Sequence, residues 1–194
     1  MASKTESTFR NMLLALFVVS FISATTLGYV YEFTKEPIAI AKLKKKIAAI
    51  KKVVPEFTND PNADMYKIAS DIKGDTLEFY PAYKDSELVG TAIKTFSDLG
   101  FTKRIYLMVG FLADGTIHNI SVLEHAETPG LGDKMDKKKS KWSEQFNGKN
   151  PANYKLIVSK DGGDVDAITA ATISSRAYTD AVDRAYKAFI ENKK

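Results

Sequence analysis

The sequence contains no cysteine in 194 residues and only two histidines, His118 and His125. The absence of cysteine excludes disulfide bonds, thiolate ligation of zinc or iron–sulfur clusters, a catalytic thiol and a lipid-modified N-terminal cysteine. Two histidines are too few for a histidine-rich metal site. We therefore predict that the chain holds no metal.

Strong charge of one sign is also missing, since the formal net charge is only +4. The lysines concentrate in two clusters, at residues 42–52 and 134–141, and neither lies on an aromatic-rich surface. Nucleic-acid-binding surfaces combine a stronger basic patch with such residues, so we predict no nucleic-acid partner. A composition of 44% apolar and 27% charged residues is typical of a single globular domain.

One long uncharged run is present, "MLLALFVVSFISATTLGYVY" at residues 12–31. About 20 apolar residues in a helix span the bilayer core of about 30 Å. The alternative, a cleaved signal peptide, has a shorter apolar core and an Ala-x-Ala site, which is not convincingly present here. We predict an uncleaved transmembrane helix over 12–31. Lysines on both sides of it leave the orientation open.

The segment after the span, "IAIAKLKKKIAAIKKVV", has helical periodicity. We expect Pro37 to break the chain and Pro55 to end this second helix. Its apolar face comprises Ile40, Leu43, Ile47, Ile50 and Val54. The lysines on the opposite face either lie in water near lipid head groups or form a dedicated site for anionic lipid or a partner.

Residues 76–124 have the alternation of strands. "TLEFYPAY" and "LVGTAIKTF" flank the turn "KDSE", and "RIYLMVGFL" and "TIHNISVLE" flank "ADG", a strong hairpin signal. The prediction is an α+β domain with a mainly antiparallel sheet. The expected organisation is a cytoplasmic N-terminus at 1–11, the transmembrane helix at 12–31, a juxtamembrane helix and connection at 32–75, and a globular domain at 76–194.

The C-terminal third is expected to contain a lysine-rich helix with "KKSKWSEQF", a strand at 154–159, a turn at Gly162–Gly163 and a final helix. Ser174 or Ser175 is the expected N-cap, which places Thr172 just before the helix. Free N–H groups at a helix start suit a phosphate, and Arg176 would add a charge-assisted bond. From these features alone, an anion site and a plain helix cap are both open.

Three ordered motifs carry a resemblance to a known family. "DAITAAT", ending in Thr172, resembles the flavinylation motif Asp-x-x-Ser/Thr-Gly-Ala-Thr of bacterial FMN-binding domains. "HAETPGLGDK" and "KDGGDVD" resemble segments of the G subunits of Rnf complexes and of the related C subunits of sodium-pumping NADH–quinone reductases. The family has glycine at the position of Ala170, needed either for φ > 0 or for clearance from FMN.

The resemblance implies one FMN per chain, joined covalently through its phosphate to the Thr172 hydroxyl by a flavin transferase. Thr169 would bond the phosphate or stabilise the turn, and Pro129 would stiffen the loop at the ring's other wall. The charges of Glu127 and Lys134 would bias the flavin potential, Asp133 would cap the next helix, and His125 is a turn residue. The implied cofactor-binding residues are Thr172, Thr169, Ala171, Ser174, Arg176, Glu127, Thr128, Gly130, Leu131 and Lys134.

The function that this resemblance implies is electron transfer within a membrane-bound ion-translocating ferredoxin–NAD oxidoreductase. The chain would have no substrate site of its own and would face the outer side of the bacterial cytoplasmic membrane. Expected partners are the FMN-bearing D subunit, the membrane A and E subunits, the flavin transferase and lipid. The alternatives are a C-type subunit of the quinone reductase, a free-standing anchored flavoprotein, and a flavin-free tethered binding or scaffold module.

Overall fold

The computed structural model describes residues 8–192, so most of the predicted N-terminal segment 1–11 lies outside the described residues. Helix α1 runs without interruption over Phe9–Val53. It contains a window long and apolar enough to cross a membrane, which fits a single-pass anchor. Thr25 Oγ1 donates to the Phe21 carbonyl at 2.8 Å, so this hydroxyl is satisfied within the helix.

The predicted break at Pro37 is wrong, because α1 continues through this residue. Proline removes one helical hydrogen bond and is therefore disfavoured in a helix interior. Here the helix continues on both sides of Pro37 despite this loss. Pro55 does follow the end of α1, as predicted. Of the predicted apolar face, Ile50 and Val54 are buried, whereas Ile47 remains 38% exposed.

The domain is built on a five-stranded antiparallel sheet in the order β1-β2-β3-β4-β5. The strands are β1 (Tyr66–Ala69), β2 (Thr76–Lys84), β3 (Glu87–Ser97), β4 (Ile105–Phe111) and β5 (Ile117–Glu124). The four strands β2 to β5 and the α+β class are as predicted. Strand β1 was not predicted, and it pairs with β2 at the edge of the sheet.

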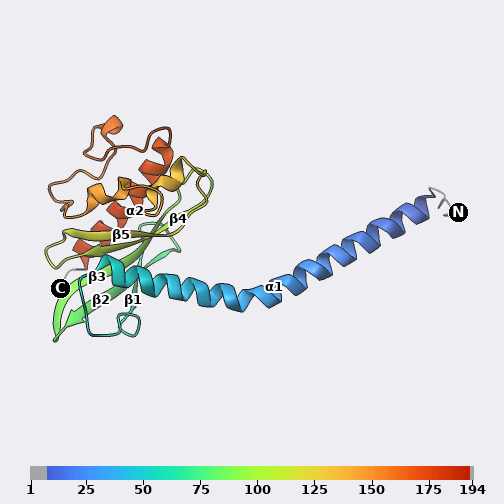
Figure 1. Cartoon of the computed structure of the whole chain (residues 1–194), viewed down its shortest axis with the longest axis horizontal. Helices are drawn as coiled ribbons and strands as arrows, with labels where there is room; N and C mark the ends of the chain where they lie inside the picture. Colours follow the sequence, from blue (N-terminus) through green and yellow to red (C-terminus); the bar gives the residue numbers. More distant parts are fainter. Residues whose placement is uncertain (1–7, 193–194) are drawn as a thin grey trace. The chain divides into compact units, whose positions relative to one another are not determined.

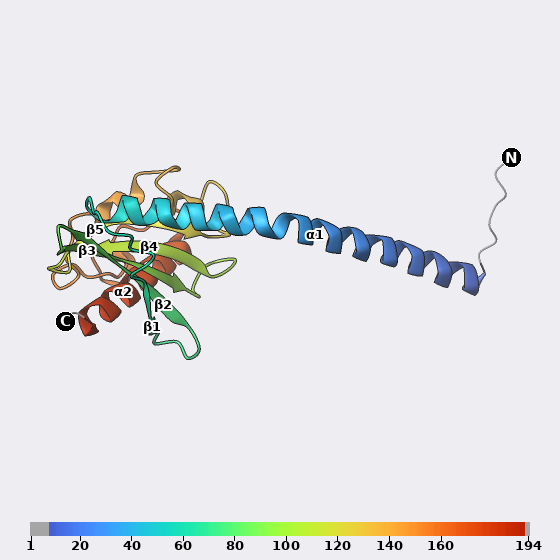
Figure 2. The same cartoon turned by 90° about the horizontal axis from the view of Figure 1, so that it is seen from below.

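Each face of the sheet has its own cluster of buried residues (Figures 1 and 2). On one face, Phe79, Ile93 and Val109 pack with helix α2 (Thr172–Glu191) in the larger cluster. On the other, Tyr80, Ala92 and Met108 pack against Ile50 and Val53 of α1. Adjacent positions of one strand therefore contact different helices, as the two-residue period of a strand requires.

The predicted lysine-rich helix and the strand at 154–159 are wrong. The chain forms only short 3₁₀ turns there, η1 (Gly132–Met135), η2 (Trp142–Phe146) and η3 (Ser159–Asp161). In the second segment a single bridge pairs Val158 with Val165. The chain bends back on itself here, so that Gly163 lies against Ile157. A Cβ added at Gly163 would be only 2.0 Å from the Ile157 carbonyl oxygen.

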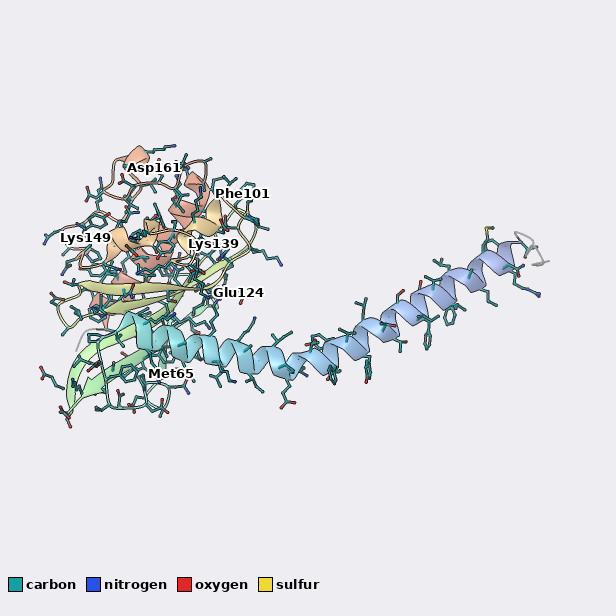
Figure 3. The ribbon with its side chains drawn as sticks, viewed as in Figure 1. Met65, Phe101, Glu124, Lys139, Lys149 and Asp161 are labelled. Atoms are coloured by element: carbon teal, nitrogen blue, oxygen red, sulfur yellow. The ribbon has the colours of Figure 1, made fainter. Side chains whose placement is uncertain are left out.

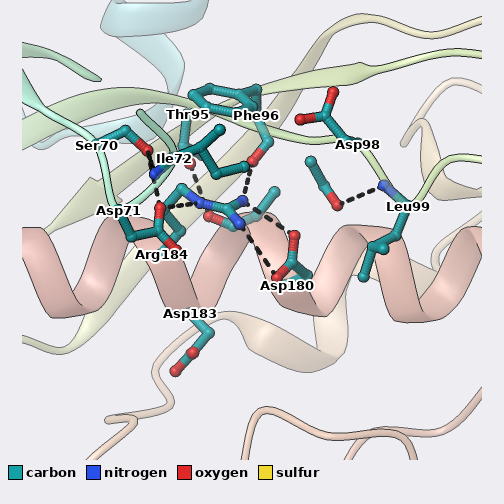
Figure 4. A network of polar contacts seen from close by, with 12 residues as sticks. Ser70, Asp71, Ile72, Thr95, Phe96, Asp98, Leu99, Asp180, Asp183 and Arg184 are labelled. Carbon is teal, nitrogen blue, oxygen red and sulfur yellow. Dashed lines mark hydrogen bonds and ion pairs between the residues drawn. The ribbon is translucent and has the colours of Figure 1, made fainter. Parts of the chain in front are cut away.

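Arg184 fastens α2 to the sheet (Figure 4). Its guanidinium donates to Asp71 before β2, to the Phe96 carbonyl at the end of β3, and to Asp180 one helical turn earlier. Nearby, Thr95 Oγ1 donates to the Ala181 carbonyl at 2.8 Å in the buried core. These bonds fix the position of α2, and thereby of its first residues, on the sheet.

On the opposite face, Glu78 joins α1 to the strands. Lys94 of β3 donates to its carboxylate at 2.8 Å, Lys46 of α1 lies at 3.4 Å, and the Tyr80 hydroxyl also donates. Burial alone would raise the pKa of Glu78, but the hydrogen bonds from Lys94 and Tyr80 and the two lysine charges lower it to about 2.

We predict that the Glu78→Gln variant is less stable by roughly 2 kcal/mol at pH 7. Because the pKa is depressed in the folded state, this stabilisation is present above about pH 4.5 and is lost as the pH falls toward 2. Urea unfolding from pH 7 to pH 3 should show a flatter pH dependence for the variant. The control is Glu87→Gln, which removes an exposed carboxylate. Equal pH profiles for Glu78→Gln and the wild type would contradict the prediction.

Candidate functional site

A tight turn precedes α2. The Ala171 N–H donates to the Ile168 carbonyl at 3.0 Å, and Ala170 at the third position has φ of 61°. A positive φ at this position alone is the pattern of a type II turn, which favours glycine. The family glycine at this position is thus explained by backbone conformation, and Ala170 adopts the same conformation despite its Cβ.

Helix α2 begins at Thr172 itself, with Ala171 as the N-cap residue. The predicted serine cap is wrong, because Ser174 and Ser175 lie inside the first turn. Ser175 Oγ instead accepts from the Ile168 N–H at 2.9 Å and donates to the Ala171 carbonyl. No side chain caps the helix, and no acidic residue lies in its first turn. The first N–H groups are therefore available to an anion.

A lysine that sequence reasoning missed lies beside Thr172. Lys160 Nζ donates to Thr172 Oγ1 at 3.4 Å, from the segment that turns back at Gly162 with φ of 83°. Lys160 belongs to the "KDGGDVD" segment, but the sequence alone does not show that this segment brings it to Thr172. Arg176 does not point its charge at Thr172. It forms a bidentate pair with Asp161 at 2.7 and 2.8 Å, which lowers the pKa of that carboxyl.

The glycine-rich loop forms a second type II turn. Leu131 N–H donates to the Thr128 carbonyl at 3.1 Å, with Pro129 second and Gly130 third at φ of 79°. Proline and glycine at these positions fit this turn type, so Pro129 does stiffen the loop. His125 lies between β5 and this turn, where its Nδ1 accepts from the Glu127 N–H at 3.2 Å.

The buried carboxylate of Glu127 ties this loop to α2. It accepts from Ser174 Oγ at 2.5 Å and from the Phe101 N–H at 2.9 Å. Gly132 lies against the same pair, where an added Cβ would be 2.4 Å from Ser174 Oγ. Three segments far apart in the sequence thus meet at one carboxylate, and the loop and the helix start predicted to share a site do lie together.

Apolar side chains surround this junction but point outward. Phe101 is 64% exposed, Ile173 47% and Leu131 39%. Each is next in sequence to a residue that lies against the Glu127 carboxylate, namely Gly100, Ser174 and Gly132. Figure 3 shows Phe101 and Asp161 at the same end of the domain. The domain thus has exposed apolar side chains beside the Glu127 carboxylate and a lysine beside Thr172 at the start of α2.

The remaining predicted residues differ in their exposure to solvent. Thr169 and Thr128 are exposed, Ala171 is buried in the N-cap, and Lys134 is partly exposed in η1. Asp133 is also in η1 instead of capping a helix, and its Oδ1 has no hydrogen-bond partner within residues 8–192. Trp142 packs edge-on against the buried Tyr178 and donates to the Asp166 carbonyl, two residues before the Ile168–Ala171 turn.

Comparison with known proteins agrees with this site. The FMN-binding domain family matches residues 100–187, which include the Glu127 loop, Lys160 and Thr172. The fold and the site therefore define an FMN-binding domain.

Relatives specify the family further. The chain is 38% identical to the G subunit of the ion-translocating oxidoreductase complex of Erwinia tasmaniensis, over 73% of this chain and 70% of the relative. It is 35% identical to the corresponding protein of Vibrio cholerae (89% and 86%) and 34% identical to that of Cereibacter sphaeroides (92% and 82%). The chain belongs to the family of G subunits of ion-translocating oxidoreductase complexes.

We predict that the Ala170→Gly variant is more stable than the wild type by about 0.5–1 kcal/mol. Glycine relieves about 1–2 kcal/mol of left-handed strain and loses about 0.5–1 kcal/mol of chain entropy. Thermal unfolding should show a higher midpoint, whereas Ala167→Gly, where φ is not positive, should lower it. A lower midpoint for both variants would show that Ala170 is not strained.

Substitution of Glu127 separates its hydrogen bonds from its charge. Glu127→Ala leaves the Phe101 N–H and Ser174 hydroxyl without their acceptor and should cost about 2–3 kcal/mol. Glu127→Gln should cost less than about 1 kcal/mol, since its amide oxygen accepts from Phe101 and its amide nitrogen donates to Ser174. Chemical denaturation measures both. Equal losses would mean that the carboxylate charge, and not the hydrogen bonding, holds the junction together.

Proposed function

We propose that the chain is an electron-transfer subunit of a membrane-bound ion-translocating ferredoxin–NAD oxidoreductase of the Rnf type, with FMN joined by a phosphoester to Thr172. The observation that carries the proposal is Thr172 at the first position of an uncapped helix, beside Lys160 and preceded by the turn of the flavinylation motif. Membership of the G-subunit family and the FMN-binding domain also support this proposal.

The residues present fit a flavin phosphate. The first N–H groups of α2 and the positive end of its dipole would hold the phosphate of a group attached at Thr172, and the Lys160 ammonium would add a counter-charge. The Arg176–Asp161 pair holds the loop carrying Lys160 against the helix. These groups hold a phosphodiester anion without needing a charged side chain in the helix itself.

Attachment requires an activated flavin. In the proposed reaction, the Thr172 oxygen bonds to the FMN phosphorus of a flavin dinucleotide, the pyrophosphate bond breaks, and the nucleoside monophosphate leaves. The hydroxyl proton passes to a base of the flavin transferase. The partly exposed position of Thr172 leaves its hydroxyl accessible to that enzyme.

The bound flavin supplies reversible electron transfer, while the chain supplies position and environment. The exposed Leu131 and Ile173 would offer apolar surface to the ring, and the Gly130 N–H of the Thr128–Leu131 turn would be the donor to its polar edge, since Pro129 has no N–H and the Leu131 N–H closes the turn. A covalent link keeps the cofactor in place where free FMN is scarce. This agrees with our further proposal that the domain lies on the outer side of the membrane, beside the D subunit and the membrane A and E subunits.

We predict that Thr172→Val abolishes covalent flavin while Thr169→Val retains it. Valine matches the shape of threonine but offers no hydroxyl, so no phosphoester forms. Each variant is coexpressed with a flavin transferase, and the denatured protein is examined by in-gel flavin fluorescence and intact mass. Undiminished fluorescence in Thr172→Val would place the linkage elsewhere and overturn the proposal.

A further inference from the structure

The two lysine clusters of the sequence meet at a groove that electron transfer does not explain. The groove has a volume of about 220 Å³ and lies between the last turns of α1, β5 and the segment after η1. We call it the lysine groove and define it by Lys45, Lys52, Asn119, Asp136, Lys137 and Lys138. Its lysines come from the clusters at 42–52 and 134–141, more than eighty residues apart in the chain.

Asn119 of β5 holds the two clusters together. Its Nδ2 donates to the Lys52 carbonyl at 2.8 Å, and its Oδ1 accepts from Lys137 Nζ. Lys45 Nζ donates to the Leu123 carbonyl on the same strand. The ammonium groups of Lys45 and Lys137 are therefore held by defined contacts with β5, whereas Lys52 and Lys138 are exposed at the groove.

The side chains that line the groove neutralise only part of its positive charge. Four lysines face one carboxylate, which leaves a formal excess of three charges, and Asp136 already accepts the Lys138 N–H. Within residues 8–192, none of these four lysines forms an ion pair. Burial lowers the pKa of Lys137, and only the charge of Glu144 opposes this effect. A carboxylate ligand would compensate these ammonium groups.

We propose that the lysine groove binds an acidic segment of another subunit of the complex, an inference that rests on the proposed assembly but not on flavin at Thr172. An excess of three charges matches several Asp or Glu side chains better than one lipid head group with a single negative charge. Apolar groups of Ala49, Ile120 and Met135 also line the groove and accommodate the stems of such side chains.

The first experiment measures binding of a fluorescein-labelled oligoglutamate peptide to the full chain in phosphatidylcholine nanodiscs, by fluorescence anisotropy. Lys52→Glu/Lys138→Glu should weaken binding about tenfold or more. The matched control Lys51→Glu/Lys139→Glu changes the same charge on the same two segments outside the groove and should alter binding less than about twofold. Equal losses in both variants would reduce the effect to overall charge and overturn the proposal.

The second experiment places a photo-crosslinking residue at position 52 in the native complex. An adduct with another subunit that the Lys138→Gln substitution diminishes supports the proposal. Adducts with lipid only, or binding to phosphatidylglycerol vesicles without binding to oligoglutamate, would overturn it in favour of a membrane contact. Far-UV circular dichroism of every variant verifies folding, and covalent flavin, measured separately by intact mass, keeps failure here distinct from failure at Thr172.

Discussion

The buried carboxylate of Glu127 is the interaction on which the site depends. It joins the Phe101 backbone, the glycine-rich loop and the first turn of α2, three segments that share no secondary structure. A buried carboxylate is costly unless its oxygens are bonded, and here each oxygen has a donor. This constraint explains why a loop after β5 and a helix start near residue 172 form one surface, with Thr172 and the exposed apolar side chains at its edge.

The helix that carries Thr172 is placed by contacts remote from it. Arg184, three turns along α2, bonds to the β1–β2 connection and to the end of β3, and Thr95 bonds to Ala181. The sheet thus determines where the helix begins, and the strained turn at Ala170 brings the chain to that point. Strain in the turn is tolerated because the surrounding contacts fix its conformation.

Much of the fold was predictable from local patterns. Residues 76–124 predicted four strands because apolar and β-branched runs of strand length are separated there by turn signals, and the motifs around Thr172 predicted the FMN-binding domain. Strand β1 was missed because "YKIA" is short and mostly exposed at the sheet edge. "YKLIVS" has the composition of a strand, but the bend at Gly163 and the bond from Lys155 N–H to Asp164 remove it from the sheet.

The sequence predicted that the glycine-rich loop and the start of α2 lie together, but it did not predict the charged contacts around Thr172. Attachment at Thr172 stays a prediction, and Arg176, expected to add a bond to the phosphate, pairs with Asp161, which becomes a neighbour only through the turn at Gly162. The same turn brings Lys160 to Thr172, a proximity that no spacing rule predicts. Likewise, the meeting of the two lysine clusters depends on how α1 packs against β5, which is a property of the tertiary structure alone.

The most direct test of the account is the site of attachment in the wild-type chain. Trypsin releases the segment Asp161–Arg176, which contains both Thr169 and Thr172. Fragmentation mass spectrometry of this peptide from the flavin-loaded protein should place the mass of FMN, less one water, on Thr172. The same mass on Thr169, or an unmodified peptide from protein that keeps covalent flavin, would contradict the account.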